Sequence, residues 1–339
     1  MRIAVIGLGF MGSTHVRAWP NVPGARLAAV YSADERKLGG DLTQVQGNLG
    51  GSTGQVDFSG VRKYTCIAKL LQDPEIEAVD ICLPTFLHSS TAIAALRAGK
   101  HVLVEKPMAL TGEIADEMIA EAAKADRTLM AAQVLRFFPS YRALYDAVQS
   151  GRCGAVRSAL LRRRCAAPFW NQWLGDIEKS GGGIFDLLIH DVDICLAMFG
   201  SPAAISATGY EDLEGGVDVI AATLHYPDIP SVVITGGWHH KKSFPFSMEY
   251  TVVTEGGTFE YSSQRGNDVT LYDAAGESRP VDVRQEDGFE AELRYFVSCC
   301  QKRERPAFCP PEESAQAVRI ALLLLEARNK KGEKIPCPS

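Results

Sequence analysis

The first third of the chain alternates short apolar runs with longer stretches in which apolar residues recur at helical spacing. This alternation is typical of βαβ units built around a parallel sheet. It predicts strands at 2–6, 26–31, 78–83 and 101–105, and helices at 89–98 and 112–125. Residues 39–60 are rich in Gly, Ser, Thr, Gln and Asn, and much of this segment is expected to be a surface loop.

Beyond Pro139 the pattern changes to many short strand-like runs, joined by turns too short for crossover helices. Such a pattern predicts an antiparallel sheet. Strands are expected at 154–166, 203–211, 217–226, 231–238, 248–255, 257–262 and 269–272, and helices at 140–149, 185–199, 289–301 and 312–330.

A chain of 339 residues exceeds what one hydrophobic core usually covers, so two domains are expected. The predicted fold class is α/β, with a parallel-sheet domain at 1–126 and a C-terminal α+β domain at 127–339 built on a large and mainly antiparallel sheet. The C-terminal helix is a candidate to pack back on the first domain.

Composition narrows the class of protein. With 46% hydrophobic and 22% charged residues, the composition is ordinary for a soluble globular protein. A net charge of -6 and a pI near 5.7 provide no long-range attraction to polyanions, so nucleic acid is not an expected partner. The nine cysteines are scattered without a CxxC pair, which favours reduced thiols and the cytoplasm. Because no secretion leader or bilayer-length apolar run is recognisable, no membrane association is expected.

The stretch GLGFMG places three glycines between the first strand and a helical run. Gly7 permits a tight turn, Gly9 lets the backbone approach a pyrophosphate, and Gly12 lets helix and strand pack closely. With Phe10 and Met11, they are predicted to bind a dinucleotide cofactor, with a plain glycine turn as the alternative.

The end of the second strand bears on the choice of cofactor. An acid is expected there when both ribose hydroxyls are bound, but this position is Ser32, followed by Arg36 and Lys37. A hydroxyl and a basic side chain suit a 2′-phosphate, so NADP is favoured, with NAD as the alternative. In the NAD interpretation, Asp34 supplies the acid from a shifted register.

Two further loops follow neighbouring strands at the edge where open α/β sheets bind ligands. PTFLH contributes Pro84, Thr85 and His88, and VEKP contributes Glu105 and Lys106; all five are predicted to line the cofactor site. The alternatives are a lysine that merely ends a strand and a histidine that caps the following helix.

In GGGIFDLLIHDVD, Asp186, His190 and Asp193 interrupt an apolar run at i, i+4 and i+7, one face of a helix. Buried carboxylates and imidazoles are costly unless paired, so this face must meet solvent, a partner, a metal or a substrate cleft. No metal is expected, because the other histidines and cysteines lack partner spacing. A structural Asp-His pair stays open.

Taken in this order and at these spacings, GLGFMG, PTFLH, VEKP and GGGIFDLLIHDVD resemble the glucose-fructose oxidoreductase / inositol dehydrogenase / rhizopine-catabolism (Gfo/Idh/MocA) family of NAD(P)-dependent oxidoreductases. The resemblance covers nearly the whole chain, and IHDVD is most similar to the inositol dehydrogenase branch. It implies that 1–126 is an N-terminal Rossmann dinucleotide-binding domain, and that the C-terminal domain at 127–339 binds substrate and mediates oligomerisation. It implies that Lys106, Asp186 and His190 are catalytic and face a cleft between the domains, where glycines 181–183 allow close backbone approach.

In the implied mechanism, His190 takes the proton from a substrate hydroxyl while Lys106 stabilises the same oxygen. Asp186 orients a substrate hydroxyl or holds His190 in place. Asp193 at most supports these residues and does not itself touch the substrate. The implied enzyme is a dehydrogenase acting on a CH-OH group of a sugar, polyol or inositol, assembled as a homodimer or homotetramer. A dinucleotide- or sugar-binding sensor and an NAD-dependent glycosidase are the rival functions.

Two segments supply substrate-binding candidates. QVLRFFPSY offers Arg136, and more weakly Gln133, where the family often has asparagine. PFWNQW offers Trp170, Asn171 and Trp173 for sugar stacking and a hydrogen bond, although core packing is the alternative for at least one tryptophan.

Overall fold

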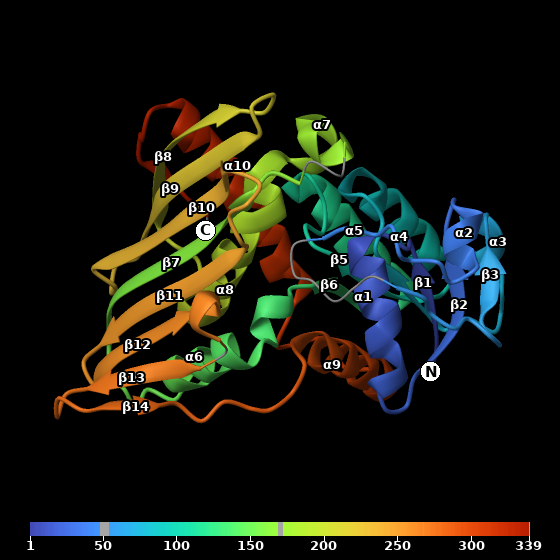
Figure 1. The fold of residues 1–339 in the computed structure, drawn as a ribbon, viewed down its shortest axis with the longest axis horizontal. Helices are drawn as coiled ribbons and strands as arrows, with labels where there is room; N and C mark the ends of the chain where they lie inside the picture. Colours follow the sequence, from blue (N-terminus) through green and yellow to red (C-terminus); the bar gives the residue numbers. More distant parts are fainter. Residues whose placement is uncertain (48–53, 169–171, 267, 339) are drawn as a thin grey trace. The chain divides into compact units, whose positions relative to one another are not determined.

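The computed structural model describes residues 1–47, 54–168, 172–266 and 268–338, and Figure 1 shows its elements. Two compact units divide the chain. The first comprises Met1–Val134 and Asp287–Ala315, and the second comprises Leu135–Glu286 and Gln316–Ser339. The sequence predicted a boundary at residue 126 and named only the C-terminal helix as a candidate to pack back on the first domain. Residues 287–315 also belong to the first unit, which depends on tertiary packing.

The first unit is built on a six-stranded parallel sheet in the order β3-β2-β1-β4-β5-β6. This order reverses between β1 and β4, as in a Rossmann fold, and ligands bind such sheets at the carboxyl ends of the strands near the reversal. The short strands β3 and β6 were not predicted. The strands are β1 (Arg2–Ile6), β2 (Arg26–Tyr31), β3 (Arg62–Tyr64), β4 (Ala78–Ile81), β5 (His101–Glu105) and β6 (Leu129–Ala132).

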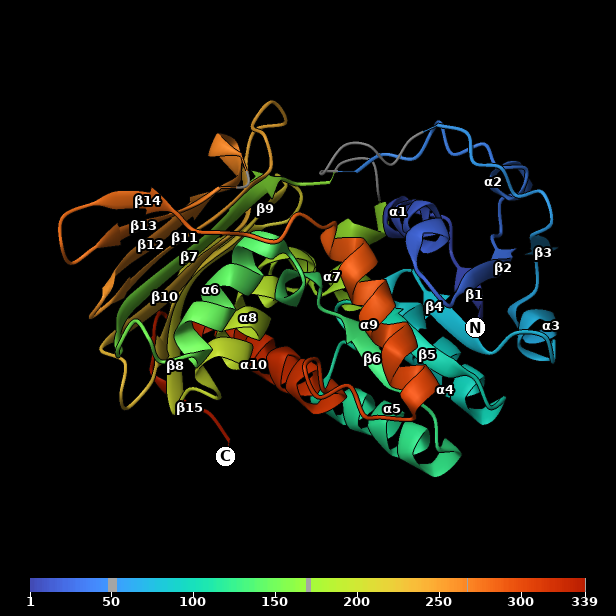
Figure 2. The same cartoon turned by 90° about the horizontal axis from the view of Figure 1, so that it is seen from below.

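Helices cover both faces of this sheet. On one face α1 (Phe10–Ala18) and α9 (Gly288–Lys302) lie side by side, and on the other α4 (His88–Arg97) packs against α5 (Gly112–Ala125) (Figure 2). Burial on both faces explains why the strands are continuous apolar runs. The remaining helices of this unit are α2 (Glu35–Leu38), α3 (Ile67–Leu71) and the 3-10 turns η1 (Trp19–Asn21) and η2 (Thr85–Leu87).

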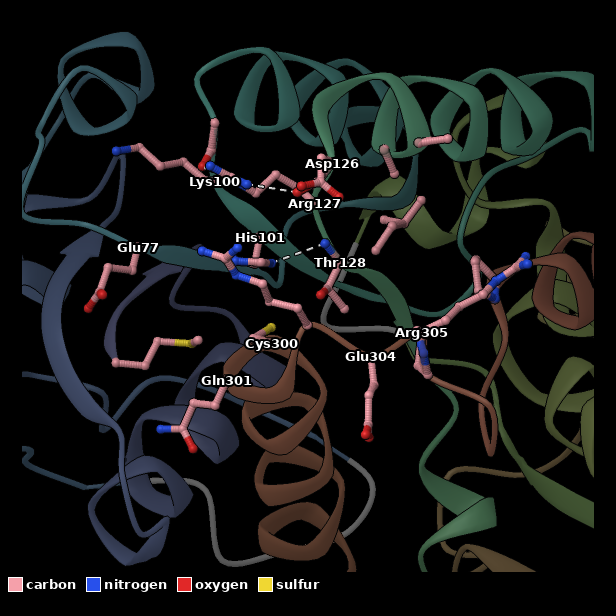
Figure 3. Close-up of a pocket in the computed structure, with 18 of the residues that line it drawn as sticks. Glu77, Lys100, His101, Asp126, Arg127, Thr128, Cys300, Gln301, Glu304 and Arg305 are labelled. Carbon is pink, nitrogen blue, oxygen red and sulfur yellow. Dashed lines mark hydrogen bonds between the residues drawn. The ribbon is translucent and has the colours of Figure 1, made fainter.

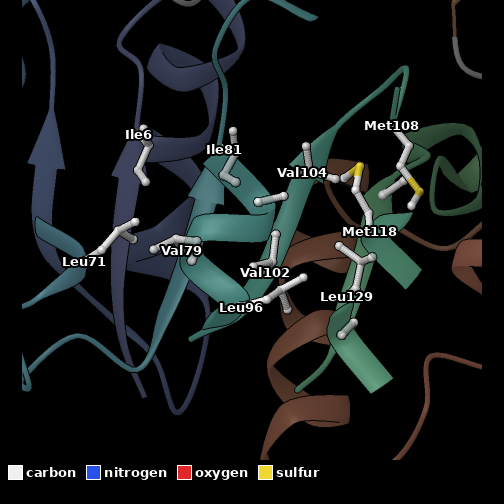
Figure 4. Close-up of a cluster of buried hydrophobic side chains, with 14 of the residues drawn as sticks. Ile6, Leu71, Val79, Ile81, Leu96, Val102, Val104, Met108, Met118 and Leu129 are labelled. Atoms are coloured by element: carbon white, nitrogen blue, oxygen red, sulfur yellow. The ribbon is translucent and has the colours of Figure 1, made fainter. Parts of the chain in front are cut away.

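The core under α4 and α5 is a continuous hydrophobic cluster (Figure 4). It combines alternate residues of the central strands with the inward faces of both helices. Its members include Ile6, Val79, Ile81, Val102, Val104, Leu96 and Met118. This core fixes the strand ends that carry the predicted cofactor loops.

The second unit is built on a nine-stranded sheet in the order β14-β13-β12-β11-β7-β10-β9-β8-β15. Strands β7 and β10 run parallel, and the other described pairs are antiparallel, so the predicted fold class is confirmed. The strands are β7 (Val156–Ala166), β8 (Ala204–Asp212), β9 (Val217–His225), β10 (Ser231–His240), β11 (Ser247–Thr254), β12 (Gly257–Ser262), β13 (Val269–Asp273), β14 (Ser278–Pro280) and β15 (Ile335–Pro336).

Helices α6 (Pro139–Gln149) and α8 (Ile189–Phe199) lie along one face of this sheet (Figures 1 and 2). The π-helical turn η5 (Ile184–Leu188) leads into α8 and packs on β10. Helix α10 (Pro311–Asn329) begins in the first unit and ends in the second. Shorter elements are η3 (Val134–Arg136), η4 (Gln172–Gly175), α7 (Ile177–Ser180) and η6 (Ser263–Arg265).

Candidate active site

The glycine-rich turn between β1 and α1 has the packing that its sequence predicts. Gly7 has a φ of +104°, and a Cβ there would lie 2.6 Å from the carbonyl oxygen of Cys82. A Cβ on Gly12 would lie 1.8 Å from the carbonyl oxygen of Gly7, whereas a Cβ on Gly9 meets nothing within 4 Å. Two glycines are therefore required by the fold, and the third borders open space.

The N-terminus of α1 fits an anion. Gly9 is the N-cap, and no side chain caps the first turn, which contains Phe10 and Met11. The first backbone N-H groups of a helix have no intrahelical partner, and together with the helix dipole they favour a phosphate. The chain's own geometry at this turn thus fits the pyrophosphate of a dinucleotide.

At the end of β2, Ser32 is 6% exposed and its Oγ accepts the N-H of Asp34 at 3.0 Å. Asp34 caps α2 by accepting the N-H of Arg36, and its carboxylate also pairs with the Arg36 guanidinium at 3.0 Å. This pairing lowers the pKa of Asp34. The Asp34 carboxylate is therefore already engaged locally, and Arg36 is exposed beside it.

The loops after β4 and β5 are joined by a buried histidine. His88 Nδ1 lies 2.8 Å from the carbonyl oxygen of Pro107, and its Nε2 lies 2.8 Å from that of Leu83. Burial lowers the pKa of His88. Its ring braces the segments that carry Pro84, the buried Thr85 and Lys106, and its side chain does not cap α4.

Glu105 belongs to a buried charged cluster that the sequence analysis missed. Its Oε2 accepts the N-H of Lys106 at 3.0 Å, and its Oε1 lies 3.3 Å from Nε2 of His15 on α1. The other ring nitrogen of His15 lies 2.9 Å from Asp80 on β4. Burial alone would lower the pKa of His15, but the carboxylates of Asp80 and Glu105 outweigh it and raise it to about 9.

Cys82 lies in the same cluster, so that histidine, aspartate and thiol atoms come within 4.8 Å of one another. Their separations are hydrogen-bond lengths, with Cys82 Sγ 3.4 Å from Asp80, and Trp19 also donates to Asp80 at 2.8 Å. We therefore describe this set as a hydrogen-bonded charge cluster. The sequence feature that could have revealed this cluster is Asp80, an aspartate inside the apolar run AVDICLP.

In the second unit the predicted helix over 185–199 is interrupted. Asp186 lies in the π-helical turn η5, and His190 lies in the first turn of α8; both side chains are half-buried. The Nε1-H of Trp238 donates to Asp186 Oδ2 at 3.0 Å. The spacing could not predict a π-turn, which is common at functional sites.

Asp193, the third residue of the predicted polar face, points into the protein. Its two carboxylate oxygens accept Nε and Nη2 of Arg136, each at 2.7 Å, and both side chains are 1% exposed. Next to it, Asp191 accepts from the buried Arg163 at 2.9 Å. Arg136 thus has a buried carboxylate partner, and its contact with substrate stays a prediction.

Of the predicted aromatic site, Trp173 lies in η4 and is half-buried. Trp170 and Asn171 lie outside the described residues. Their proposed contacts with a sugar therefore stay predictions.

A large cavity of about 1070 Å³ lies within the first unit (Figure 3). Lys100 and His101 at the start of β5, Thr128 before β6, and Cys300 of α9 line it. It is therefore at the amino ends of the strands, whereas the glycine-rich turn follows the carboxyl end of β1. None of the predicted site residues is among its described lining residues.

A Rossmann sheet with an uncapped, glycine-bounded helix N-terminus defines the class of dinucleotide-binding proteins. The model described as "Oxidoreductase family, NAD-binding Rossmann fold" matches residues 1–133, and the model of the GFO/IDH/MocA C-terminal domain matches 141–260. The chain belongs to the Gfo/Idh/MocA family of oxidoreductases, and the predicted resemblance is confirmed.

Named relatives include a myo-inositol 2-dehydrogenase of Thermotoga maritima, 29% identical over 347 residues that cover 98% of this chain and 97% of the relative. A 1,5-anhydro-D-fructose reductase of Ensifer adhaerens is 35% identical over 278 residues, covering 78% and 81%. The structure of levoglucosan dehydrogenase in complex with NADH and levoglucosan has a TM-score of 0.85 at 17% identity and full coverage of both chains, which shows the same fold.

Within the described ranges, none of the helices combines the length and apolar character needed to cross a bilayer. All nine cysteines lie in described ranges, and none of them is in a disulfide bond.

Proposed function

We propose that the protein transfers a hydride between a nicotinamide dinucleotide and a secondary alcohol, or the matching ketone, of a polyol, sugar or inositol. The observation that carries this proposal is the pairing of a dinucleotide-shaped glycine turn with the family's lysine, aspartate and histidine motifs in one chain. The relatives' names refer to an inositol, an anhydro-sugar and levoglucosan, which share several neighbouring hydroxyl groups.

The dinucleotide, when bound, accepts or returns the hydride at its nicotinamide ring. In our proposal His190 takes the proton of the reacting hydroxyl, and Lys106 donates a hydrogen bond to the same oxygen as negative charge develops there. Asp186 accepts a neighbouring substrate hydroxyl. Its Oδ2 accepts the Nε1-H of Trp238, which fixes the orientation of the carboxylate.

We propose NADP as the preferred cofactor. The position that usually carries an acid is Ser32, and the exposed guanidinium of Arg36 lies close by, paired with the half-buried carboxylate of Asp34. A 2′-phosphate could compete for this guanidinium and accept the Ser32 hydroxyl. Introducing S32D should therefore shift the ratio of kcat/KM for NADP to kcat/KM for NAD about tenfold or more toward NAD, as expected when like charges repel.

Matched variants separate this reading from its alternative. R36A should lower kcat/KM for NADP and leave kcat/KM for NAD unchanged. If instead D34A lowers kcat/KM for NAD and R36A has no effect on kcat/KM for NADP, Asp34 binds the ribose hydroxyls and the protein prefers NAD.

We also propose a homodimer or homotetramer that forms through the open face of the nine-stranded sheet. By register, Leu160 of β7, Tyr272 of β13 and Tyr210 of β8 all lie on the face opposite α6 and α8, and they are 43%, 43% and 55% exposed. Large apolar side chains on one face favour burial against a second copy. Sedimentation that shows only monomer at micromolar concentration would exclude this assembly.

The free thiols favour a reducing compartment, and we propose the cytoplasm as the place of action. Localisation of a tagged full-length chain tests this directly.

The activity is tested by following reduced nicotinamide absorbance while the purified protein meets a panel of inositols, sugars and sugar acids, with NAD and with NADP. Turnover that disappears in K106A supports the dehydrogenase. Binding of both cofactors with no turnover of any compound would instead favour a sensor, and cleavage of a chromogenic glycoside with tightly held NAD would favour a glycosidase.

A further inference from the structure

The turn that carries Asp186 is held by two residues that face each other across neighbouring strands. Trp238 of β10 and Asp218 of β9 are cross-strand partners in the antiparallel pair. Their side chains are 2% and 0% exposed. We propose that Trp238 and Asp218 are positioning residues that together fix the Asp186 carboxylate for catalysis, an inference that rests on the proposed function of Asp186.

Trp238 holds the carboxylate itself. Its Nε1-H donates to Asp186 Oδ2 at 3.0 Å, and its ring is packed in a small buried cluster with Cys165, Ala167 and Leu187. Because the indole is locked by packing, the direction of its N-H is locked as well. The indole N-H is a donor only, so Oδ2 of Asp186 is always the acceptor in this hydrogen bond.

Asp218 holds the start of the same turn. Its Oδ2 accepts the backbone N-H of Gly183 at 2.7 Å, and its Oδ1 accepts Nη1 of Arg328. The other terminal nitrogen of Arg328 donates to Glu211 at 2.8 Å. One oxygen of the buried Asp218 carboxylate therefore pairs with a guanidinium, and the other binds the backbone three residues before Asp186.

The glycines before the turn make room for this pair. Gly182 has a φ of +77°, and a Cβ there would lie 2.4 Å from Asp218 Oδ2. A Cβ on Gly183 would lie 3.0 Å from the carbonyl oxygen of Asp218 and 3.2 Å from the Trp238 ring. The sequence analysis assigned these glycines to substrate approach; the structure shows that two of them allow close contact with Trp238 and Asp218.

The energetic logic follows from the π-turn. A π-turn is a rare conformation that persists only where its surroundings favour it. Here Asp218 of β9 accepts the N-H of Gly183, and Trp238 of β10 donates to Asp186. The segment from Gly183 to Asp186 is therefore attached to the sheet at both of its ends. Preorganisation of this kind lowers the reorganisation needed during the reaction.

The decisive variant is W238F, which removes the N-H while it keeps an aromatic ring. Losing a hydrogen bond to the Asp186 carboxylate should lower kcat/KM for the alcohol substrate about tenfold, mainly through kcat, whereas the KM for the cofactor should not change. Y226F is the matched control: it removes an aromatic hydroxyl that donates to the carbonyl oxygen of Gly200 at 3.1 Å, and it should leave both parameters unchanged.

A second measurement does not depend on turnover or on W238F folding. The chain has four tryptophans, so incorporation of 5-fluorotryptophan gives four fluorine NMR resonances. One resonance, that of Trp238, should change its chemical shift in D186N, because that substitution alters the group that accepts the indole N-H.

The outcomes separate the two proposals. A W238F protein with the kcat/KM of the wild type overturns the positioning role and leaves the dehydrogenase intact. A fluorine spectrum that D186N leaves unchanged overturns the contact itself. A resonance that moves in D186N, in a protein that turns over no substrate, overturns the proposed function, and with it the catalytic meaning of the contact, while it upholds the contact.

Discussion

The imidazole of His15 should make the stability of the first unit depend on pH in a specific way. The ring is 0% exposed and lies between the carboxylates of Asp80 and Glu105, which raise its pKa from 6.5 to about 9. A raised pKa means that the folded chain keeps a proton that the unfolded chain releases. The stabilisation is therefore complete below pH 6.5 and is lost as the pH rises toward 9.

The size of the effect follows from the same shift. A rise from 6.5 to about 9 corresponds to about 3 kcal/mol of unfolding free energy at 1.36 kcal/mol per pH unit. The variant H15N keeps a side-chain donor on the Asp80 side but carries no titratable charge. We expect H15N to be less stable than the wild type by the largest amount at pH 6, and the difference to shrink by roughly 3 kcal/mol toward pH 9.

The assay is urea unfolding of both proteins at pH 6, 7.5 and 9, reported as the difference between variant and wild type at each pH. The substitution also removes packing contacts, but that loss is the same at every pH. H239N changes an exposed histidine and should show no such trend. A difference that stays constant from pH 6 to pH 9 would refute a buried, charged His15.

Two further predictions test the packing of each unit. G12A should lower both the thermal stability and the affinity for the cofactor, because its Cβ would lie 1.8 Å from the Gly7 carbonyl oxygen; G9A, whose Cβ meets nothing within 4 Å, should lower only the affinity. Calorimetry and cofactor titration on the two variants check this, and equal melting temperatures would contradict it. R136M should destabilise the protein by about 3–5 kcal/mol, because it leaves the buried Asp193 carboxylate without its partner, and D193N in the same chain should recover part of that loss. Urea unfolding measures both, and an R136M protein as stable as the wild type would show that this buried pair contributes nothing.

The elements that the sequence predicted well are those with long, regular patterns. The strands β1, β2 and β5 are close to their expected ranges because they are uninterrupted apolar runs, and the helices α5 and α9 because their apolar residues recur at helical spacing. The strands β3 and β6 have three and four residues, too few to show a period. Membership of α9 in the first unit is a matter of long-range contact, which the pattern of one segment does not contain.

The polar face of GGGIFDLLIHDVD shows the same limit at the site. Helical spacing grouped Asp186, His190 and Asp193 together, but the π-turn changes the direction of Asp186, and Asp193 turns to a buried arginine. A residue's position in the sequence does not report its partner. The partners Arg136 and Trp238 come from segments more than forty residues away, so only the folded chain could identify them.

Two of the three predicted catalytic residues, Lys106 and Asp186, lie next to buried polar groups that hold them. The backbone N-H of Lys106 donates to the carboxylate of Glu105, whose other oxygen faces the imidazole of His15. Behind Asp186 lie Trp238 and, at the start of the turn, Asp218.

Charged and polar groups buried in this way add little net stability, because their desolvation offsets most of the attraction between them. What they supply is direction, since a hydrogen bond loses most of its strength when its geometry is poor. A chain selected for stability alone could have replaced these groups with apolar residues of similar volume. Their presence directly behind the predicted reactive groups, in both units, is therefore best explained by a requirement for fixed geometry at the site.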